Sequence, residues 1–477
     1  MQESRLIELI EKIIANKHEG QTTEVKASKG GPPRVYKTLS SFSNTNDGVI
    51  VFGLDENDNF KPVGVYNAQK LQEDIFNQCQ EMVPAVRYVA TVVKYKGVDI
   101  VSAEIPEIVH NEKPCYHKAS GTKSAHIRVG NNDSPMSEFE IYSYEIYKRH
   151  QRDDIRPIEI AVGKPINQVK IDKFLLALKT NRSNLATTPN DELLELNSFT
   201  KNGVPSLAHC VLFSIYPQAF FPNLCIHAVV VPGYNMGDTT ESGERFSDNK
   251  KIEGTLDEQV EDAIAFIRKN MSVKTSFDKD TAKRTDIPEY PLKAVREAVL
   301  NAVIHRDYSH HTENQPIQIL MFKDRMEIRS PGGLFGRVKI NELGVVQPDT
   351  RNPNIIKALE LMNVTENRFS GIPTIKKSMK EHGLPEPLFL SERGDFTITL
   401  FNGHHQETAS PDIQKQILAF CKTPRALKEI SDHIGFKSHQ YIRNTFLNEM
   451  LDKGLLRLTV PHAPGSKYQK YATVSPK

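Results

Sequence analysis

The segment that decides the fold of this chain is Pro291-Leu-Lys-Ala-Val-Arg-Glu-Ala-Val-Leu-Asn-Ala-Val-Ile-His305. Its apolar residues fall on almost every side of a helix, which predicts a helix that is buried nearly all round. Glu297, Asn301 and His305 follow one another at four-residue intervals, so they share one face. A buried carboxylate, amide and imidazole must bond either to neighbouring backbone or to a ligand. Structural bonding is the commoner case, so the segments that follow the helix decide between the two.

The residues after this helix predict a strand, a tight turn, a second strand and a glycine loop. The strands are 316–322 and 326–329, the turn is Lys323-Asp-Arg325, and the loop is Ser330-Pro-Gly-Gly333. The glycines allow backbone to approach another group closely. This order of elements resembles the GHKL ATPases, in a divergent branch found in bacterial ATP-binding regulators. The resemblance covers roughly residues 285 to 400.

The resemblance implies an ATP site. In this family an adenine nucleotide lies over a sheet, and the helix supplies a Glu that orients water and an Asn that binds Mg²⁺. Glu297 and Asn301 match these positions, and an amide oxygen suits a hard cation that also binds substrate phosphates. The expected nucleotide-binding residues are Asn301, His305, Ser330, Gly332, Gly333 and Gly371, with Glu297 as the ATPase base.

Two departures from the family pattern concern hydrolysis more than binding. Most members have an adenine-reading Asp in the first glycine box, where this chain has Ser330-Pro331. The later Gly-x-Gly box has Phe369 in place of its first glycine. Weak ATPase activity and a pocket that only binds both remain open. The chain has no Walker-type phosphate loop, so any ATPase must be of another kind.

Composition limits the class of protein. A chain of 477 residues suggests about three domains. With 61 basic and 59 acidic residues, the net charge of +2 excludes a uniformly cationic coat but allows local basic patches. Five cysteines, none paired at metal-ligand spacing, favour a reducing compartment. The charged amphipathic N-terminus is neither a signal peptide nor a membrane span, so we expect a cytoplasmic protein.

Residues 8 to 150 resemble the Schlafen AlbA-type domain. The motifs that carry this resemblance are Glu19 with Glu24-Val-Lys26, Asn46-Asp-Gly48, Gly53-Leu-Asp-Glu56 and Arg128-Val-Gly130. Bacterial members are regarded as DNA-binding, whereas some eukaryotic members cleave RNA with three acidic residues.

The resemblance places those three acidic residues at Glu19, Glu24 and Glu56, with Asp55 beside the last. A carboxylate triad around Mg²⁺ or Mn²⁺ can activate water for phosphodiester cleavage. Glu at the third position, where the family has Asp, lengthens that ligand by one methylene. The alternative is that the Glu-x-Lys motif forms an ion pair and the domain only binds.

The region 155–285 carries the least chemistry. Its segments 205–213 and 225–231 predict a buried helix and a core strand, and we expect the histidines on them, His209 and His227, to be core residues rather than ligands.

Residues 410 to 477 resemble a winged helix, with predicted helices over 412–420, 426–434 and from Ser438, and a hairpin of 455–460 with 469–474. Base edges and phosphates suit the polar residues of a recognition helix and wing. The expected DNA contacts are Lys437, His439, Gln440, Arg443, Asn444, Lys467 and Lys470. The alternative is a winged helix used for protein contact.

The sequence therefore predicts an α+β multidomain protein. The expected domains are a Schlafen AlbA-like domain (1–150), a connecting α/β region (155–285), a GHKL-like ATP-binding α/β sandwich (286–405) and a winged helix (410–477). The resemblances imply a bacterial, nucleotide-responsive DNA-binding regulator of transcription or defence that uses ATP and Mg²⁺. One alternative is a nucleotide-gated, metal-dependent nuclease acting on RNA or single-stranded DNA. Another is an interaction scaffold with an inactive nucleotide pocket, and self-association is left open.

Overall fold

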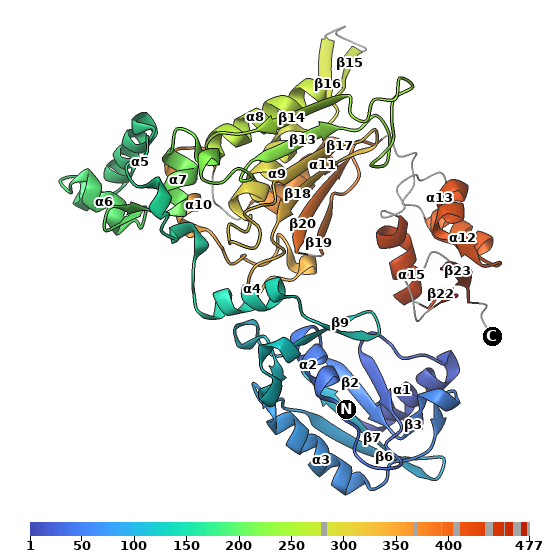
Figure 1. Ribbon diagram of the computed structural model, residues 1–477. Coiled ribbons are helices and arrows are strands. Elements are labelled where there is room, and N and C mark those ends of the chain that lie inside the picture. The colour runs from blue at the N-terminus through green and yellow to red at the C-terminus, as the bar shows by residue number, and fades with distance from the viewer. Residues whose placement is uncertain are drawn as a thin grey trace. The chain divides into compact units, whose positions relative to one another are not determined.

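The computed structural model describes residues 1–277, 284–365, 370–392, 394–403, 411–434, 442–452, 454–460 and 469–474 (Figure 1). The chain divides into two compact units, residues 1–152 with 335–337, and residues 153–334 with 338–477. None of the helices in the described ranges has the length and apolar composition needed to cross a bilayer.

The first unit is built on a four-stranded sheet of order β1-β2-β7-β6, in which β1 runs parallel to β2 and the other pairs are antiparallel. Its elements are α1 (Glu3–Asn16), β1 (Thr23–Lys26), α2 (Tyr36–Asn44), β2 (Gly48–Phe52), β3 (Leu54–Asp55), β4 (Lys61–Pro62), α3 (Ala68–Gln80), β5 (Met82–Val83), β6 (Val89–Tyr95), β7 (Val98–Ile105), β8 (Tyr116–His117), β9 (His126–Val129), β10 (Asn132–Pro135) and α4 (Glu138–Lys148).

This sheet is covered on both faces. Successive residues of a strand point to opposite faces. Accordingly, Ile50 and Phe52 of β2 pack in one core with α2 and α3, and Val51 between them packs in another core with α1. The apolar face of the N-terminal amphipathic helix therefore forms part of the core of a globular unit.

The second unit contains the remaining elements. They are α5 (Gln168–Asn181), α6 (Asn190–Leu196), β11 (Thr200–Lys201), β12 (Val204–Pro205), α7 (Leu207–Phe213), β13 (Ile226–Val230), β14 (Asp248–Ile252), α8 (Leu256–Asn270), β15 (Val273–Phe277), β16 (Arg284–Pro288), α9 (Leu292–Ile304), β17 (Ile317–Met321), β18 (Arg325–Pro331), α10 (Pro353–Leu361), α11 (Gly371–Glu381), β19 (Leu388–Glu392), β20 (Asp395–Phe401), α12 (Pro411–Phe420), β21 (Arg425–Ala426), α13 (Leu427–Ile434), a π-helical turn (Arg443–Leu447), α15 (Asn448–Asp452), β22 (Leu456–Leu458) and β23 (Lys470–Thr473).

The central feature of this unit is a six-stranded sheet of order β14-β13-β17-β18-β20-β19. Strand β13 pairs in parallel with β17, with Ile226 opposite Ile317. The sheet therefore crosses residue 285, where the sequence predicts a boundary between the connecting region and the ATP-binding domain. Since β13, β14 and α8 share the sheet and the core with the later residues, the segment from 226 onward is an integral part of that domain.

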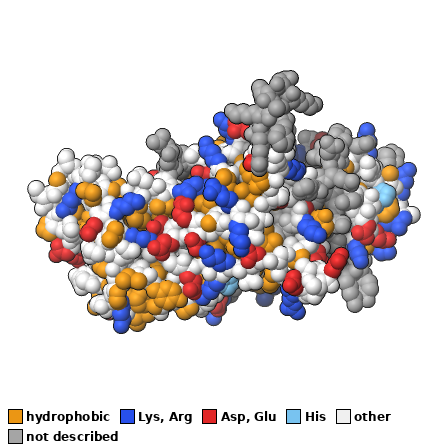
Figure 2. Space-filling view, turned by 90° about the horizontal axis from the view of Figure 1, so that it is seen from above, with side chains coloured by type: hydrophobic (Ala, Val, Ile, Leu, Met, Phe, Trp, Pro, Cys, Tyr) orange, Lys and Arg blue, Asp and Glu red, His pale blue; other side chains and the backbone are white. Residues whose placement is uncertain are grey.

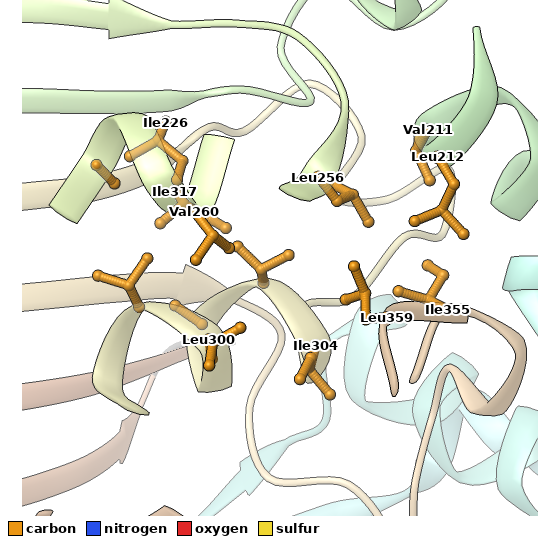
Figure 3. Packing of buried hydrophobic residues seen from close by; sticks show 14 of the residues in the cluster. Val211, Leu212, Ile226, Leu256, Val260, Leu300, Ile304, Ile317, Ile355 and Leu359 are labelled. Atoms are coloured by element: carbon orange, nitrogen blue, oxygen red, sulfur yellow. The ribbon is translucent and has the colours of Figure 1, made fainter. Parts of the chain in front are cut away.

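Helix α9 packs deeply in this core. The sequence predicts a helix over 291–305 with an apolar surface, and α9 confirms it, with Val295, Val299 and Val303 among its buried residues. Figure 3 shows Leu300 and Ile304 of α9 within the cluster that includes Ile226, Ile317 and Val260. The two strands predicted after the helix are also present, as the antiparallel pair β17 and β18.

The helix and strand predicted in the middle region are present as α7 and β13, and every residue of α7 is buried. His209 of α7 is buried and His227 of β13 is half-buried, as expected for core rather than ligand positions. Burial lowers the pKa of His209 to about 4, so the ring is neutral at pH 7.

The C-terminal residues form a small module with its own core, in which Ile417, Ile430, Phe446 and Tyr471 are buried together. Its three strands lie in the order β21-β23-β22. The helices and hairpin strands come in the order that the sequence predicts. The start of the predicted recognition helix and the tip of the wing lie outside the described residues, so the winged helix stays a prediction.

Candidate nucleotide and nucleic-acid sites

The polar side chains of Glu297 and Asn301, which form a stripe along α9, face the first residue of another helix. A methyl group added at Gly371, where α11 begins, would lie 3.0 Å from Nδ2 of Asn301 and 3.3 Å from Oε2 of Glu297. These separations are tighter than ordinary van der Waals contact, so a side chain at this position would fill the space in front of the stripe. The structure thus brings Glu297, Asn301 and Gly371 together.

Nδ2 of Asn301 is buried and has no hydrogen-bond partner among the described residues. Leaving a buried donor without an acceptor costs about 1–3 kcal/mol, and such groups call for an explanation such as an absent ligand or ion. Within the part of the chain that the structure describes, this N–H is therefore available for a bond to another group.

The N-terminus of α11 adds an electrostatic feature to the same place. This helix has 11 residues, and the side chain of its N-cap residue, Ser370, makes no cap bond to its first N–H groups. Unpaired N–H groups and the helix dipole make such an end attractive to phosphate. A carboxylate, an unpaired amide and a helix N-terminus therefore lie together at the edge of the sheet's helical layer.

His305 directly follows α9 and is reached by solvent. Its pKa is nevertheless lowered to about 4, first because protein atoms surround the imidazole and second because the Arg351 guanidinium is close. The imidazole is neutral at pH 7 and can donate one hydrogen bond and accept another.

A buried ion pair supports the first glycine box. Arg351 Nη1 lies 2.7 Å from Asp307 Oδ2, and both side chains are only 4% exposed. A methyl group at Gly332 would come within 2.5 Å of both Arg351 Nη1 and Asp307 Cβ, and the φ of +100° at Gly332 also favours glycine. The glycine loop is thereby fixed against the residues that follow α9.

The predicted nucleotide residue Ser330 has a structural bond. Its hydroxyl donates to the carbonyl of Ala302 at 2.7 Å and so ties β18 to α9. At Gly333 an added methyl group would lie 2.9 Å from Oγ of Ser391, which also accepts a hydrogen bond from the backbone N–H of Leu334. Ser391 and the Asp307–Arg351 pair thus lie beside the glycine box, and the sequence gave no signal for Ser391.

In the first unit, Glu24 belongs to an ion-pair network. Arg128 Nη1 lies 2.9 Å from Glu24 and 2.8 Å from Asp133, and its side chain is 2% exposed. Lys26 also pairs with Glu24. Two cations therefore bind the Glu24 carboxylate, and its pair with Arg128 joins β1 to the β9–β10 hairpin.

Glu19 lies near enough to Glu24 and Glu56 for their charges to raise its pKa. Its pKa is raised to about 7, chiefly by burial, then by repulsion from Glu24 and, more weakly, from Glu56. Its Oε1 accepts a hydrogen bond from the N–H of Val25 at 2.6 Å. Asp55 has a different role, because its carboxylate accepts from the N–H of Asn57 and caps a short 3₁₀ turn.

The described residues contain no group of three or more His, Cys, Asp or Glu side chains arranged to hold a metal ion. The structure therefore brings Glu19, Glu24 and Glu56 into one electrostatic neighbourhood without forming a ligand set. Their predicted metal binding stays a prediction.

Part of the predicted DNA-binding set can be located. Arg443 and Lys470 are exposed, at the start of the π-helical turn and of β23. Lys437, His439, Gln440 and Lys467, together with the side chain of Asn444, lie outside the described residues. That these residues contact DNA stays a prediction.

Two family models match the chain. One, described as Schlafen, AlbA_2, matches residues 19–137, and the other, described as "Putative ATP-dependent DNA helicase recG C-terminal", matches residues 314–400. The chain thus carries a Schlafen AlbA_2 domain and an HATPase-type domain, which confirms both assignments made from the sequence. Helix α9, with Glu297 and Asn301, precedes the second matched range. No curated protein matches the chain significantly.

Three solved structures are similar to this chain, each with a low TM-score. The DIP2311 protein from Corynebacterium diphtheriae is 15% identical, with 99% of this chain and 97% of that chain covered and a TM-score of 0.37. The N-terminal domain of a putative ATP-dependent DNA helicase RecG-related protein from Nitrosomonas europaea is 25% identical over 28% of this chain and 88% of that one, with a TM-score of 0.22. A Fic family protein from Desulfovibrio desulfuricans G20 is 14% identical, covering 27% and 29%, with a TM-score of 0.13.

Proposed function

We propose that this protein is a cytoplasmic regulator that binds ATP with Mg²⁺ beside α9 and changes its engagement of DNA in response. The observation that carries the nucleotide part is the position of Gly371 against Asn301 and Glu297, with the Asn301 amide unpaired among the described residues. The nucleic-acid part is supported by the AlbA_2 domain and by the family described as a DNA helicase C-terminal domain.

The residues present fit a nucleotide with its metal. The N-terminus of α11 would hold phosphate oxygens, and Oδ1 of Asn301 would supply a hard oxygen ligand for Mg²⁺. Bound Mg²⁺ would neutralise phosphate charge. Glu297 can orient a water or accept a proton from it, which is the step that hydrolysis requires. With Ser330 bonded to Ala302, the carboxylate that reads adenine in related proteins has no substitute at that position, so we expect binding with slow hydrolysis.

The test is calorimetry of ATP binding with and without Mg²⁺. The wild type should bind in a Mg²⁺-dependent manner, and Asn301→Ala should lose that dependence. Asn249→Ala, which changes an exposed amide on β14 of the same sheet, is the matched control. Equal Mg²⁺-dependent affinity in the wild type and in Asn301→Ala would contradict the assignment.

A metal-dependent nuclease is the second candidate, and the raised pKa of Glu19 among neighbouring acids favours it. The pairing of Glu24 with Arg128 and Lys26 opposes it. Because metal binds only the native site, Mn²⁺ should raise the melting temperature of a true metalloenzyme. Glu56→Gln, which leaves the Arg128 network intact, should then remove both that shift and any cleavage of RNA, single-stranded DNA or duplex. We expect neither shift nor cleavage.

A further inference from the structure

Two aromatic rings meet on the first unit at a place that none of the acidic residues discussed above occupies. Tyr36 begins α2 and His117 ends β8, and their ring centroids are 4.3 Å apart at an interplanar angle of 45°. Glu81, at the end of α3, accepts a hydrogen bond from the Tyr36 hydroxyl and lies 3.5 Å from His117 Nε2. Both rings are half-buried, so their positions are fixed while part of each ring stays open to solvent.

Exposed cations occur next to both rings in the chain. Arg34 lies close enough for its charge to act on the Tyr36 phenol, and Lys37 follows Tyr36 directly. Lys118 follows His117, and its backbone N–H donates to the carbonyl of Glu81 at 2.8 Å. Lys123 precedes Ser124, whose hydroxyl accepts from the N–H of His117 at 3.0 Å. The exposed basic residues of this surface are Arg34, Lys37, Lys118 and Lys123.

The loop that carries Arg34 is held in place by one side chain. The amide of Gln78 on α3 accepts from the N–H of Val35 and donates to the carbonyl of Pro33, both at 2.9 Å. Val35, the N-cap residue of this nine-residue helix, makes no side-chain cap bond, so the positive end of α2 lies beside Arg34 and Tyr36 in the chain. Basic side chains, a helix end and two rings are therefore pre-positioned together.

We infer that this surface binds the sugar–phosphate backbone of a single-stranded nucleic acid, with an unpaired base against the Tyr36–His117 ring pair. Phosphates supply most of the affinity of such complexes and are neutralised by Lys and Arg. Half-exposed rings among cations are typical of sites that stack unpaired bases, whereas a duplex hides its base faces. Basic and acidic side chains are interspersed over the face of the molecule seen in Figure 2.

The inference rests on the proposed nucleic-acid function and deepens it, because it places a contact on the AlbA_2 domain. The test uses the full chain and a labelled single-stranded oligonucleotide, with binding followed by fluorescence anisotropy over a range of salt concentrations. The double variant Arg34→Gln/Lys118→Gln should weaken binding and reduce the salt slope by roughly 1.4, since each lost phosphate contact contributes about 0.7 for single strands. The control is Arg5→Gln/Lys94→Gln, which removes the same charges from exposed positions of the same unit on α1 and β6.

The ring pair is tested separately by Tyr36→Leu, which keeps apolar packing and removes the aromatic face. Loss of a stacked base should weaken single-strand binding by roughly 5-fold to 100-fold and leave duplex binding unchanged. Melting temperatures of all variants show whether they fold. If the wild type binds single strands and both Arg34→Gln/Lys118→Gln and Tyr36→Leu bind them equally well, the proposed surface is wrong and the proposed function still stands. A wild-type protein that binds neither single strands nor duplex would overturn both.

Discussion

Replacing Gly371 by alanine should weaken nucleotide binding and leave the stability of the fold almost unchanged. The added methyl group would lie 3.0 Å from Nδ2 and 3.2 Å from Oδ1 of Asn301, and 3.3 Å from Oε2 of Glu297. Both neighbours are side chains that can give by a few tenths of an ångström. The backbone at Gly371 is helical, where alanine is favoured over glycine by about 0.5–1 kcal/mol. The steric cost and the helical gain therefore nearly cancel, and the melting temperature should change little.

Binding should respond differently, because the methyl group occupies the space in front of the Asn301 amide. Overpacking by one methyl group costs about 1–3 kcal/mol, which corresponds to a loss of ATP affinity of roughly 5-fold to 150-fold. The assay is calorimetry with ATP and Mg²⁺, alongside thermal unfolding. Gly30→Ala is the matched control, since a methyl group there meets nothing within 4 Å. Unchanged ATP affinity in a folded Gly371→Ala protein would refute the reasoning that places phosphates at the start of α11.

Three further predictions concern the acidic network and the C-terminal module. Glu19→Gln should stabilise the protein by about 1–3 kcal/mol, and this gain should grow as the pH rises from 5 to 8. The reason is that a carboxyl whose folded-state pKa is raised to about 7 opposes folding once it is ionised. Denaturant titration at both pH values checks this, and a pH-independent difference would contradict it. Arg128→Met should destabilise the first unit by about 3–5 kcal/mol, measured by urea unfolding, since it removes the cation that pairs with Asp133 and leaves Glu24 with Lys26 alone. Arg443→Ala should weaken duplex binding by about 1–3 kcal/mol and change the preferred sequence if this exposed side chain reaches a base edge; identical sequence selection by the variant would exclude base contact.

The sequence predicted best the elements whose signal is local. Helix α9 was readable because its apolar residues cover nearly every face, and the polar stripe of Glu297 and Asn301 stood out against them. The strands β17 and β18 were readable from a short turn between two apolar runs. In each case a segment of the chain carries enough information to specify its own conformation.

The sequence failed where contacts join distant residues. The bond from Ser330 to Ala302 depends on how β18 packs against α9, and the pairing of Glu24 with Arg128 joins residues that are far apart in the chain. The inclusion of β13 in the central sheet depends on a parallel pairing with β17 across the whole of α8 and α9. Residue types gave no signal of these partners, because many pairings would satisfy the same side chains.

The pairing of β13 with β17 has a consequence for how this protein can vary. A true linker tolerates insertion, shortening or exchange, because its neighbours fold without it. Residues 226–270 lack that freedom, since removing them would strip two strands and α8 from the sheet on which α9 rests and expose Ile317 and Ile319 to water. Recombination that transfers the HATPase-type domain to another protein must therefore carry this segment with it, and a fragment beginning at residue 286 should fail to fold.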